Sequence, residues 1–395
     1  MPRLAELTNV IHPSPTLFLD AQVKALKARG VNGINLGVGE PDFPTPGHIV
    51  KAAEEALRAG FTKYTASEGI LELREAVAGK LAAERGLEYG AGQIVVGSGG
   101  KHALCNAMFC LFGQGDEVII PGPAWVTYPE LVRICGAEPV MVETRREDGY
   151  ILKAGALERA LSPRTRGLII NSPNNPTGMV YGRADLEALV GVIEAADLWV
   201  ISDDIYEKLI YDGREFWNLP MVAPRTAERT VIIGGVSKTY AMTGWRIGYL
   251  AGPEPVARAA AKLQSQMTSN PNSLAQKAAV AALTGPQDEA RAMAAVFGRR
   301  RETVVGLLRE MPGVECLEPA GAFYVFPDVS AHFGRTLGGV TIKGSDDLAS
   351  VLLKECLVAT VPGSGFGEDR ALRLSYAAAQ SDIEEGLRRM TAFLA

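Results

Sequence analysis

Short runs of apolar residues alternate, through the middle of the chain, with segments in which apolar residues recur every three or four positions. The runs have the length of strands and are apolar throughout, as in a sheet that is buried on both faces. They lie at residues 93–96, 117–120, 138–142, 167–170, 198–201, 230–233 and 247–250, and helical segments lie between several of them, at 101–112, 124–135, 154–161 and 184–196. The alternation predicts an α/β fold with a mostly parallel central sheet covered by helices on both sides.

The pattern changes near residue 290. A long charged helix is predicted first, and shorter strands and helices follow it. These elements are expected at residues 288–310, 320–326, 345–356, 357–361 and 373–376, with a last helix after them. We therefore expect a large domain over residues 46–290 and a smaller α+β domain over residues 291–395. Residues 1–45 do not fit the central sheet and are expected to form an N-terminal arm and part of the small domain.

Five loops of unusual composition follow five of the predicted strands. They are rich in glycine, proline, asparagine and other polar residues and occupy residues 97–101, 121–125, 171–178, 202–206 and 234–238. In sheets of this kind ligands bind outside the carboxyl ends of the strands. The loops therefore predict one site at one edge of the sheet.

The last of these loops holds Lys238 directly after Ser237, and Arg246 comes eight residues later beside another apolar run. A buried lysine amine can have a pKa well below its usual value of about 10.4 and can attack a carbonyl. An arginine beside it can bind a phosphate. The pair fits a pyridoxal 5'-phosphate site with Lys238 as the Schiff-base lysine, although a surface loop with ordinary charges is the alternative.

Asp203 and Tyr206 follow the strand predicted at residues 198–201. A carboxylate beside a pyridine nitrogen keeps that nitrogen protonated and makes the ring an electron sink. A phenol three residues further on could hydrogen-bond the ring hydroxyl. An aspartate in this position is also a common N-cap of a helix, so both interpretations of Asp203 stay open on these residues alone.

The other loops offer groups for an anion or a planar ring. Gly99 and Gly100 open a predicted helix, whose N-terminus favours an anion such as phosphate, although a plain tight turn is the alternative. The G-x-G-x-x-G spacing of dinucleotide sites is missing. Asn175 could point its amide at a ring oxygen, and Trp125 could stack on a ring or pack in the core. Arg373 lies in an apolar strand and needs a carboxylate partner, from a substrate or from the protein.

Composition and charge disfavour several other functions. The 395 residues are 47% hydrophobic, which is ample for two domains. A net charge of -5 leaves no basic excess for nucleic acid or anionic membranes. Neither a membrane span nor a signal peptide is recognised, and the five scattered cysteines favour free thiols. A cytoplasmic protein is expected, and no metal is assigned because the four histidines share no ligand spacing.

Together these motifs resemble those of class I, fold-type I pyridoxal-phosphate-dependent aminotransferases, of the branch that contains bacterial aspartate aminotransferases and their prephenate-accepting relatives. The matching segments occur in the family's order over almost the whole chain. They include Gly-Glu-Pro-Asp-Phe at 39–43, Asn-Ser-Pro-Asn-Asn-Pro-Thr-Gly at 171–178, Ser-Lys at 237–238, Met-Thr-Gly-Trp-Arg-Ile-Gly at 242–248 and Arg-Leu-Ser-Tyr-Ala at 373–377, with further matches at 63–64, 69–74, 99–101, 125–129, 202–207 and 321–324.

The resemblance implies that pyridoxal 5'-phosphate is the cofactor and that Lys238 binds it covalently. Asp203 would pair with its pyridine nitrogen, Tyr206 and Asn175 with its ring oxygen, and Trp125 would stack on the ring. The phosphate would be held by Gly99, Gly100, Ser237 and Arg246 and by Tyr64 from the partner subunit, with Lys101 close to it. Such a shared site implies a homodimer.

The resemblance also implies a substrate pocket. Arg373, Asn175 and the Gly39 backbone would bind the substrate α-carboxylate, with Trp125 in the same pocket. Lys101 and Thr16 match the pocket that this branch has for a side-chain carboxylate; the alternative for Lys101 is to neutralise the phosphate or to remain solvated.

Three residues depart from the family pattern. Ala124 stands where relatives often carry tyrosine, and Asp204 replaces a common glutamate. His12 stands where prephenate-accepting relatives tend to carry a longer basic residue. The last departure weakens an assignment to prephenate more than one to aspartate.

The predicted function is therefore reversible, ping-pong transamination, with L-aspartate and 2-oxoglutarate as the expected substrates and Lys238 as general base and then general acid. Transamination of aromatic, prephenate or alanine-type substrates, and β-elimination from sulfur amino acids, are alternatives on the same scaffold. A non-catalytic regulator would need an effector or DNA-binding module, for which no stretch is recognised, and a nicotinamide dehydrogenase would need a different glycine spacing.

Overall fold

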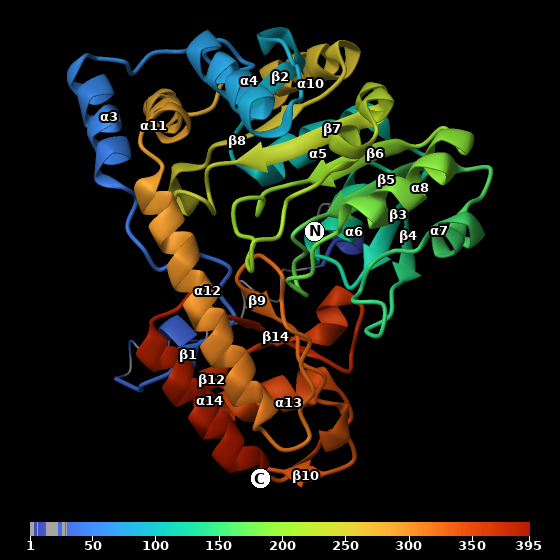
Figure 1. Cartoon of the computed structure of the whole chain (residues 1–395), viewed down its shortest axis with the longest axis vertical. Helices are drawn as coiled ribbons and strands as arrows, with labels where there is room; N and C mark the ends of the chain where they lie inside the picture. The colour runs from blue at the N-terminus through green and yellow to red at the C-terminus, as the bar shows by residue number, and fades with distance from the viewer. Residues whose placement is uncertain (1–3, 6, 13–22, 26–27, 29) are drawn as a thin grey trace.

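A central sheet forms the upper part of the molecule in Figure 1, and a smaller group of strands and helices lies below it. The structure is a computed structural model and describes residues 4–5, 7–12, 23–25, 28 and 30–395. Thr16, expected in the substrate pocket, lies outside the described residues.

Seven strands make up the central sheet, in the order β2-β8-β7-β6-β5-β3-β4. They are β2 (Ile94–Gly97), β3 (Glu117–Gly122), β4 (Glu138–Glu143), β5 (Thr165–Asn171), β6 (Trp199–Asp203), β7 (Thr230–Gly235) and β8 (Gly248–Ala251). Neighbours are parallel except at β8, which is antiparallel to both β2 and β7. The predicted mostly parallel sheet is confirmed, and no predicted strand end is wrong by more than two residues.

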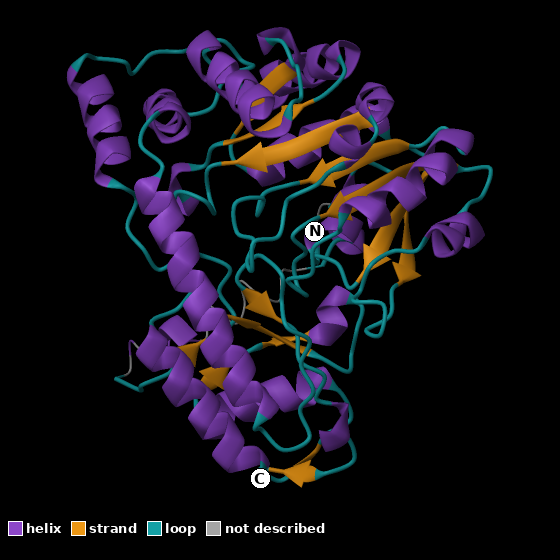
Figure 2. Cartoon of the chain, viewed as in Figure 1, coloured by secondary structure: helices purple, strands orange, loops and turns teal. Residues whose placement is uncertain are grey.

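Helices cover both faces of this sheet because successive side chains of each strand point to opposite faces (Figure 2). On β5, Ile169 packs into one cluster and Leu168 and Ile170 into another. The first face is covered by α5 (Gly100–Leu111), α6 (Thr127–Ile134) and α10 (Glu254–Met267), and the second by α4 (Leu71–Arg85), α7 (Ala154–Ala160), α8 (Arg183–Ala195) and α11 (Ser273–Thr284), with α3 (Gly47–Arg58) packed on α11. Strands buried on both sides explain why the runs in the sequence are continuously apolar.

The smaller part is built from short strands and three helices around its own apolar cluster. Its strands are β1 (Ile34–Asn35), β9 (Tyr324–Val325), β10 (Thr336–Leu337), β11 (Val340–Thr341), β12 (Val358–Ala359), β13 (Val361–Pro362) and β14 (Leu372–Ser375), and its helices are α12 (Asp288–Arg309), α13 (Ser345–Val351) and α14 (Gln380–Leu394). Two very short helices, α1 (Leu7–Val10) and α9 (Leu219–Val222), lie elsewhere in the chain. β13, β14 and β9 form an antiparallel sheet.

Two strands predicted here are wrong in extent. The strand expected at residues 320–326 is limited to β9 because Ala322 has a φ of 55° and turns the chain just before it. The run at residues 357–361 divides into β12 and β13, which pair with different strands, β1 and β14.

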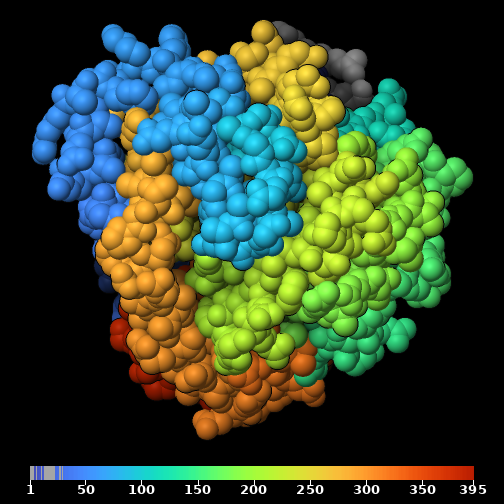
Figure 3. Space-filling model, turned by 45° about the horizontal axis from the view of Figure 1, so that its top comes forward, coloured from blue at the N-terminus to red at the C-terminus, as the bar shows by residue number. Residues whose placement is uncertain are grey.

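Segments far apart in the sequence join in this part of the molecule, since β1 at residues 34–35 pairs in parallel with β12 at residues 358–359. Helix α12 runs from the large sheet's helices down to α14 (Figure 1), and its side chains form a continuous band on the face drawn in Figure 3. The domain boundaries at residues 45 and 290 stay a prediction. Among the described residues, no helix has both the length and the apolar character needed to cross a bilayer.

Candidate active site

A cavity of about 380 Å³ lies at the edge of the sheet where β2, β3, β5, β6 and β7 end and β8 begins. It is lined by Gly37, Val38, Gly39, Glu40, Gly100, Lys101, Trp125, Tyr128, Asn171, Asn175, Asp203, Ile205, Tyr206, Ser237, Lys238, Arg246, Tyr324 and Arg373. The five loops singled out in the sequence thus meet around one space, together with residues 37–40 and two residues from the antiparallel sheet of the smaller part.

Lys238 follows β7 in the loop at the carboxyl end of that strand. Its Nζ donates a hydrogen bond of 2.7 Å to the Gly39 carbonyl. Burial, and with it the charges of Arg246 and Arg373, lower the pKa of the amine while nearby carboxylates such as Glu40 raise it, and the net result is a pKa of about 8. About a tenth of this amine is therefore uncharged at pH 7, far more than for an exposed lysine, and that fraction is available as a nucleophile or base.

Asp203 is the last residue of β6 and faces the cavity. Its Oδ2 accepts a hydrogen bond of 2.7 Å from the Tyr128 hydroxyl, and its Oδ1 accepts one of 3.3 Å from the Ile205 amide. Burial raises the pKa of this carboxyl to about 6, although both hydrogen bonds favour the ionised form. A cation placed against Asp203 would remove the cost of its buried charge.

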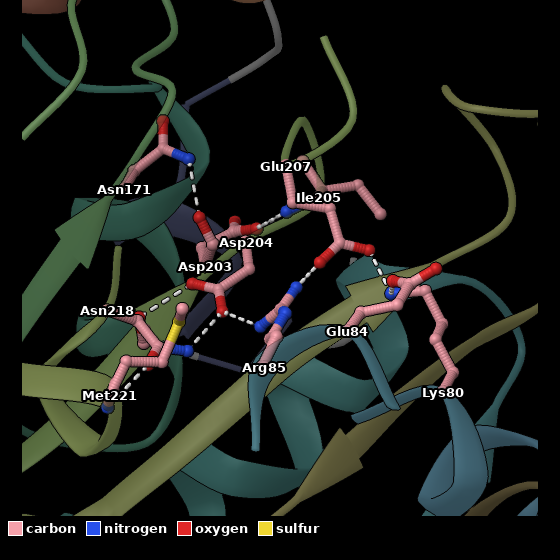
Figure 4. Close-up of polar contacts among 11 residues, drawn as sticks. Lys80, Glu84, Arg85, Asn171, Asp203, Asp204, Ile205, Glu207, Asn218 and Met221 are labelled. Atoms are coloured by element: carbon pink, nitrogen blue, oxygen red, sulfur yellow. Dashed lines mark hydrogen bonds and ion pairs between the residues drawn. The ribbon is translucent and has the colours of Figure 1, made fainter. Parts of the chain in front are cut away.

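Asp204, the next residue, points away from the cavity into a buried group of charges (Figure 4). Its Oδ2 accepts hydrogen bonds from Arg85 at 2.6 Å and Asn218 at 2.9 Å. Glu207 pairs with both Arg85 and Lys80. Asp204, which stands where the family commonly has glutamate, thus belongs to a charged network outside the cavity. This network holds the end of β6 in place.

A cradle for an anion lies at the N-terminus of α5. Gly99 has a φ of 91°, and a Cβ there would lie 2.3 Å from Nη2 of Arg246, so only glycine lets the guanidinium approach this turn. The helix begins at Gly100, with free N–H groups and the positive end of its dipole directed at the cavity. Ser237 is buried beside them on the cavity wall.

Lys101 reaches from the first turn of α5 over Trp125, with Nζ 4.8 Å from the ring centroid. Burial, and then the charge of Arg246, lower the pKa of its amine. Two cations therefore lie side by side here, and an anion between or beyond them would be bound favourably.

Arg373 lies in β14 and is only 2% exposed. It donates from Nη1 to Asn175 Oδ1 at 2.9 Å and from Nη2 to the Gly37 carbonyl at 2.6 Å, and its guanidinium lies 4.5 Å from the Tyr324 ring centroid. Its buried Nε has no hydrogen-bond partner among the described residues. No ion pair joins it to a carboxylate in that part of the chain, so the carboxylate expected from the sequence is not one of the described side chains.

The cavity as a whole carries excess positive charge. Four cationic side chains line it, those of Lys101, Lys238, Arg246 and Arg373, against the two carboxylates of Glu40 and Asp203. In a chain whose net charge is -5, this local excess marks the place where an anionic ligand binds.

Comparison with known proteins agrees with this geometry. Residues 31–390 match the aminotransferase class I and II family. The chain belongs to this family of aminotransferases. The aspartate/prephenate aminotransferase of Cereibacter sphaeroides is 46% identical over 394 residues, which cover 99% of this chain and 98% of that protein. The aspartate aminotransferase of Bacillus subtilis is 43% identical, with 99% of each chain covered.

Solved structures of relatives share the fold over the whole chain. The aspartate aminotransferase of Rhizobium meliloti superposes with a TM-score of 0.96 at 41% identity and covers 100% of this chain and 99% of its own. The aspartate aminotransferase of Thermus thermophilus, solved with maleate, gives a TM-score of 0.93 at 40% identity, and both chains are covered completely. These likenesses confirm the fold-type I aminotransferase architecture expected from the motifs.

The site of this aminotransferase contains most, but not all, of the residues expected from the sequence. Gly99 lies beside the cavity, against Arg246. Tyr64 is 92% exposed and does not line the cavity of its own chain. Two tyrosines in the matched motifs were not assigned a role: Tyr128, which donates to Asp203, and Tyr324, whose hydroxyl lies 2.9 Å from that of Tyr206. Both are tyrosines in apolar stretches, where a buried hydroxyl needs a partner.

The groups in this aminotransferase cavity fit pyridoxal 5'-phosphate. The glycine cradle with Arg246 suits a phosphate, and the unpaired Asp203 carboxylate suits a protonated ring nitrogen. Trp125 offers a flat surface on the cavity wall. The buried Lys238 amine, whose pKa is lowered to about 8, suits an aldehyde.

Proposed function

We propose that this aminotransferase uses pyridoxal 5'-phosphate and transfers the amino group of L-aspartate to 2-oxoglutarate. The observation that carries the proposal is the Lys238 amine, buried, lowered in pKa to about 8, and placed in one cavity with Asp203 and Arg373. Relatives named aspartate aminotransferase match the chain over almost its full length. Some relatives are also named for prephenate, whereas these names give no support to β-elimination.

A direct test combines spectroscopy and a coupled assay. The purified protein should show a visible absorbance band of a bound pyridoxal group. It should form oxaloacetate from aspartate continuously only when 2-oxoglutarate is present, and should form no more than one equivalent per site without it. Ping-pong kinetics should give parallel lines in double-reciprocal plots. A colourless protein that gains no band when pyridoxal 5'-phosphate is added would contradict the proposal.

We propose the following division of labour within the site. Lys238 would hold the cofactor, Asp203 its ring nitrogen, Tyr206 and Asn175 its ring oxygen, and Trp125 would stack on the ring. Gly99, Gly100, Ser237 and Arg246 would bind the phosphate, with Lys101 next to them. When bound, the cofactor supplies a conjugated ring that accepts the electrons released when the substrate loses its α-proton.

The Lys238 amine would move that proton. It is the basic group of the cavity with a pKa near the working pH, and a general base is most effective under that condition. After removing the α-proton it would return a proton as the conjugate acid. Tyr128 and the Ile205 amide would hold Asp203 ionised through this step, because both donate to its carboxylate.

Arg373 would receive the α-carboxylate of every substrate. It is buried, and among the residues that the structure describes its Nε has no hydrogen-bond partner and its other nitrogens donate only to the neutral oxygens of Asn175 and Gly37. A substrate carboxylate would give the Arg373 guanidinium a charged acceptor in place of a neutral one, and the two groups would form a bidentate pair.

We expect the substitution Arg373→Ala to lower kcat/KM by about 10²-fold or more for amino and oxo acids alike, chiefly through KM. Charge-assisted hydrogen bonds contribute roughly 1.5–3 kcal/mol each, and a bidentate arginine makes two. Initial rates with aspartate, glutamate and alanine measure the effect. A loss restricted to the two dicarboxylic amino acids would show that Arg373 binds the side chain instead.

We propose Lys101 as the group that binds the side-chain carboxylate of aspartate. It lines the cavity beside Arg246 and above Trp125 and is part of the positive excess. The Thermus thermophilus relative was solved with maleate, a four-carbon dicarboxylate. The proposed partner of Lys101, Thr16, lies outside the described residues.

The substitution Lys101→Met is expected to lower kcat/KM for aspartate and glutamate by about tenfold while changing alanine and phenylalanine less than about threefold. A lysine is a point charge without a bidentate fork, which limits the loss. Methionine keeps most of the length of the side chain over Trp125. Equal losses for acidic and neutral substrates, together with weaker cofactor binding, would assign Lys101 to the phosphate.

Prephenate should be a poorer acceptor than 2-oxoglutarate. His12 is exposed, and its Nδ1 lies 3.2 Å from Oε1 of Glu130, which also pairs with Arg133. The short side chain at position 12 is therefore engaged with an acidic group of the protein. Although some relatives are named aspartate/prephenate aminotransferases, the expected preference stays a prediction, and a panel of acceptors tests it.

We propose that the working unit is a cytoplasmic homodimer with shared sites. Tyr64 is exposed on the loop before α4 and lies outside its own cavity, so a phosphate contact by Tyr64 requires a second subunit. Mixing inactive Lys238→Ala chains with Tyr64→Ala chains should produce heterodimers with one intact site. Sedimentation or light scattering that finds only monomers in the active protein would contradict the shared site.

A further inference from the structure

The segment at residues 37–42 forms one wall of the cavity and contacts two of its cations. Gly37, Val38, Gly39 and Glu40 line the space. The Gly37 carbonyl accepts from Arg373 and the Gly39 carbonyl from Lys238. The position of this segment therefore decides where both cationic groups lie.

The segment has no regular secondary structure, and contacts at its two ends hold it in place. At its start, the amide of Leu36 donates to Ala359 at 3.0 Å and its carbonyl accepts from Ser375 at 2.6 Å. Beyond its other end, Thr45 donates to the Ala241 carbonyl. Between these points the strongest contact is an ion pair that Asp42 makes with Arg300 of helix α12.

The pair between Arg300 and Asp42 is bidentate, and it joins a buried arginine to an aspartate whose side chain is 29% exposed. Nη1 lies 2.7 Å from Oδ1 and Nη2 2.8 Å from Oδ2, and Arg300 is only 7% exposed. The guanidinium lies over two aromatic rings, 5.1 Å from the centroid of Phe43 and 5.8 Å from that of Phe297. Only the planar fork of arginine can make both contacts with the carboxylate while stacking on the rings.

We propose that Arg300 is a positioning residue of the transamination site. Through Asp42 it holds residues 37–42 in the place where the Gly39 backbone and Arg373 meet the α-carboxylate of an amino or oxo acid. Without the pair, the segment must be ordered each time a substrate binds, and part of the binding free energy is lost. The role in substrate binding rests on the proposed function.

The adjacent residue on the same helix provides a matched control. Arg301 is 3% exposed and makes a bidentate pair with Asp212, both contacts being 2.7 Å, and its guanidinium lies 4.9 Å from the Tyr211 ring. Asp212 lies on a turn and does not line the cavity. Arg301 also donates to the Pro319 carbonyl, so its replacement removes at least as many contacts. Arg300→Met and Arg301→Met therefore each remove a bidentate pair of a buried arginine from one helix, and only the first removes a pair that holds the cavity wall.

The experiment compares these variants as holoenzymes in a full kinetic analysis. Arg300→Met should raise KM for both aspartate and 2-oxoglutarate about tenfold or more, because a misplacement of about 1 Å at a site can cost up to about 10²-fold. The kcat value should change less than about threefold, as should both parameters in Arg301→Met. Arg300→Lys, which keeps the charge without the fork, should be intermediate.

Asp42→Asn gives a second route to the same result if Arg300→Met does not fold. It removes the ionic partner with almost no change in volume, and it should raise KM similarly. The double variant should be no worse than Arg300→Met, because both changes break one interaction. An additive loss, or equal KM changes in the Arg300 and Arg301 variants, would overturn the proposal.

Hydrogen exchange separates this inference from the proposed function. In the absence of any substrate, amides in the peptide that covers residues 36–43 should exchange at least about tenfold faster in Arg300→Met than in Arg301→Met. Unchanged exchange there would overturn the positioning role even in an active enzyme. Faster exchange in a protein that does not transaminate would instead support the structural contact and refute the function.

Discussion

Replacement of Lys238 by alanine is expected to lower the turnover of aspartate and 2-oxoglutarate by about 10³-fold or more. The substitution removes the amine that binds the cofactor and also the base that moves the α-proton, and a positioned acid–base group alone contributes about 10²–10⁴-fold. Steady-state and single-turnover rates measure the loss. Borohydride reduction followed by peptide mapping should attach the cofactor to the Lys238 peptide in the wild type and to no peptide in the variant.

A second substitution separates two roles of Lys238, proton transfer by its amine and the positive charge of its side chain. Lys238→Arg keeps a positive group in the same place but cannot lose its proton in the working pH range, so it should be nearly as inactive as the alanine variant. Arginine that restores activity would mean that the charge alone matters. Attachment of the cofactor to another lysine would refute the assignment itself.

The pH dependence of covalent cofactor binding gives an independent test of the same amine. Burial lowers the pKa of Lys238 to about 8, so the uncharged, reactive fraction rises with pH and is nearly complete above pH 9. The rate at which the protein without cofactor binds pyridoxal 5'-phosphate covalently should reach half its maximum at about pH 8 and level off above about pH 9. A rate that still rises at pH 10 would indicate an ordinary solvent-exposed lysine.

The central sheet and the position of the site could be predicted because both depend on simple periodicities. Continuous apolar runs identify strands buried on both faces, and the carboxyl ends of parallel strands share one edge. Antiparallel β8 preserves this result, since it runs against both β2 and β7 and leaves their carboxyl ends on the same side. Lys238, Asp203 and Asn175 could be grouped for that reason.

Contacts between distant segments could not be predicted in the same way. Tyr128 reaches Asp203 from α6, which packs on β3 and β4, and nothing in the local sequence encodes that placement. Asp204 and Arg85 are separated by 119 positions and look like ordinary surface charges in the sequence. Charges such as those of Asp204 and Arg85 can be buried only when every one of them has a partner. The pattern of charges along one helix does not reveal partners on other segments.

Asp203→Ala is the other substitution with a large expected effect. It should leave Lys238 able to bind the cofactor, but turnover should fall by about 10²–10³-fold, since a preorganised charge at the place where electrons accumulate is worth about that much. Asp203→Glu should be much milder because it keeps the charge. Rates with aspartate and the absorbance of the bound cofactor measure the two effects separately. Near-normal turnover in the alanine variant would reduce Asp203 to a cap of the following turn.

The same carboxylate should make the protein without cofactor less stable at neutral pH. Burial raises the pKa of Asp203 from 3.8 to about 6. Between these values the carboxyl ionises in the unfolded chain but not in the folded one, so stability falls as pH rises from about 4 to about 6. The loss approaches about 3 kcal/mol above pH 6, at about 1.4 kcal/mol per pH unit.

Asp203→Asn removes this ionisation while keeping the size of the side chain. We compare the free energy of unfolding of the asparagine variant with that of the wild type, both without cofactor. The difference in favour of the variant should grow as pH rises from 4 to 6 and should stay constant above pH 6. With cofactor bound to the wild type the gain should shrink or reverse, because the ring nitrogen is the missing cation. Denaturant titrations at pH 4, 6 and 8 measure these differences. A gain that does not depend on pH would show that the Asp203 charge is already compensated within the protein and would remove the reason to pair it with the cofactor.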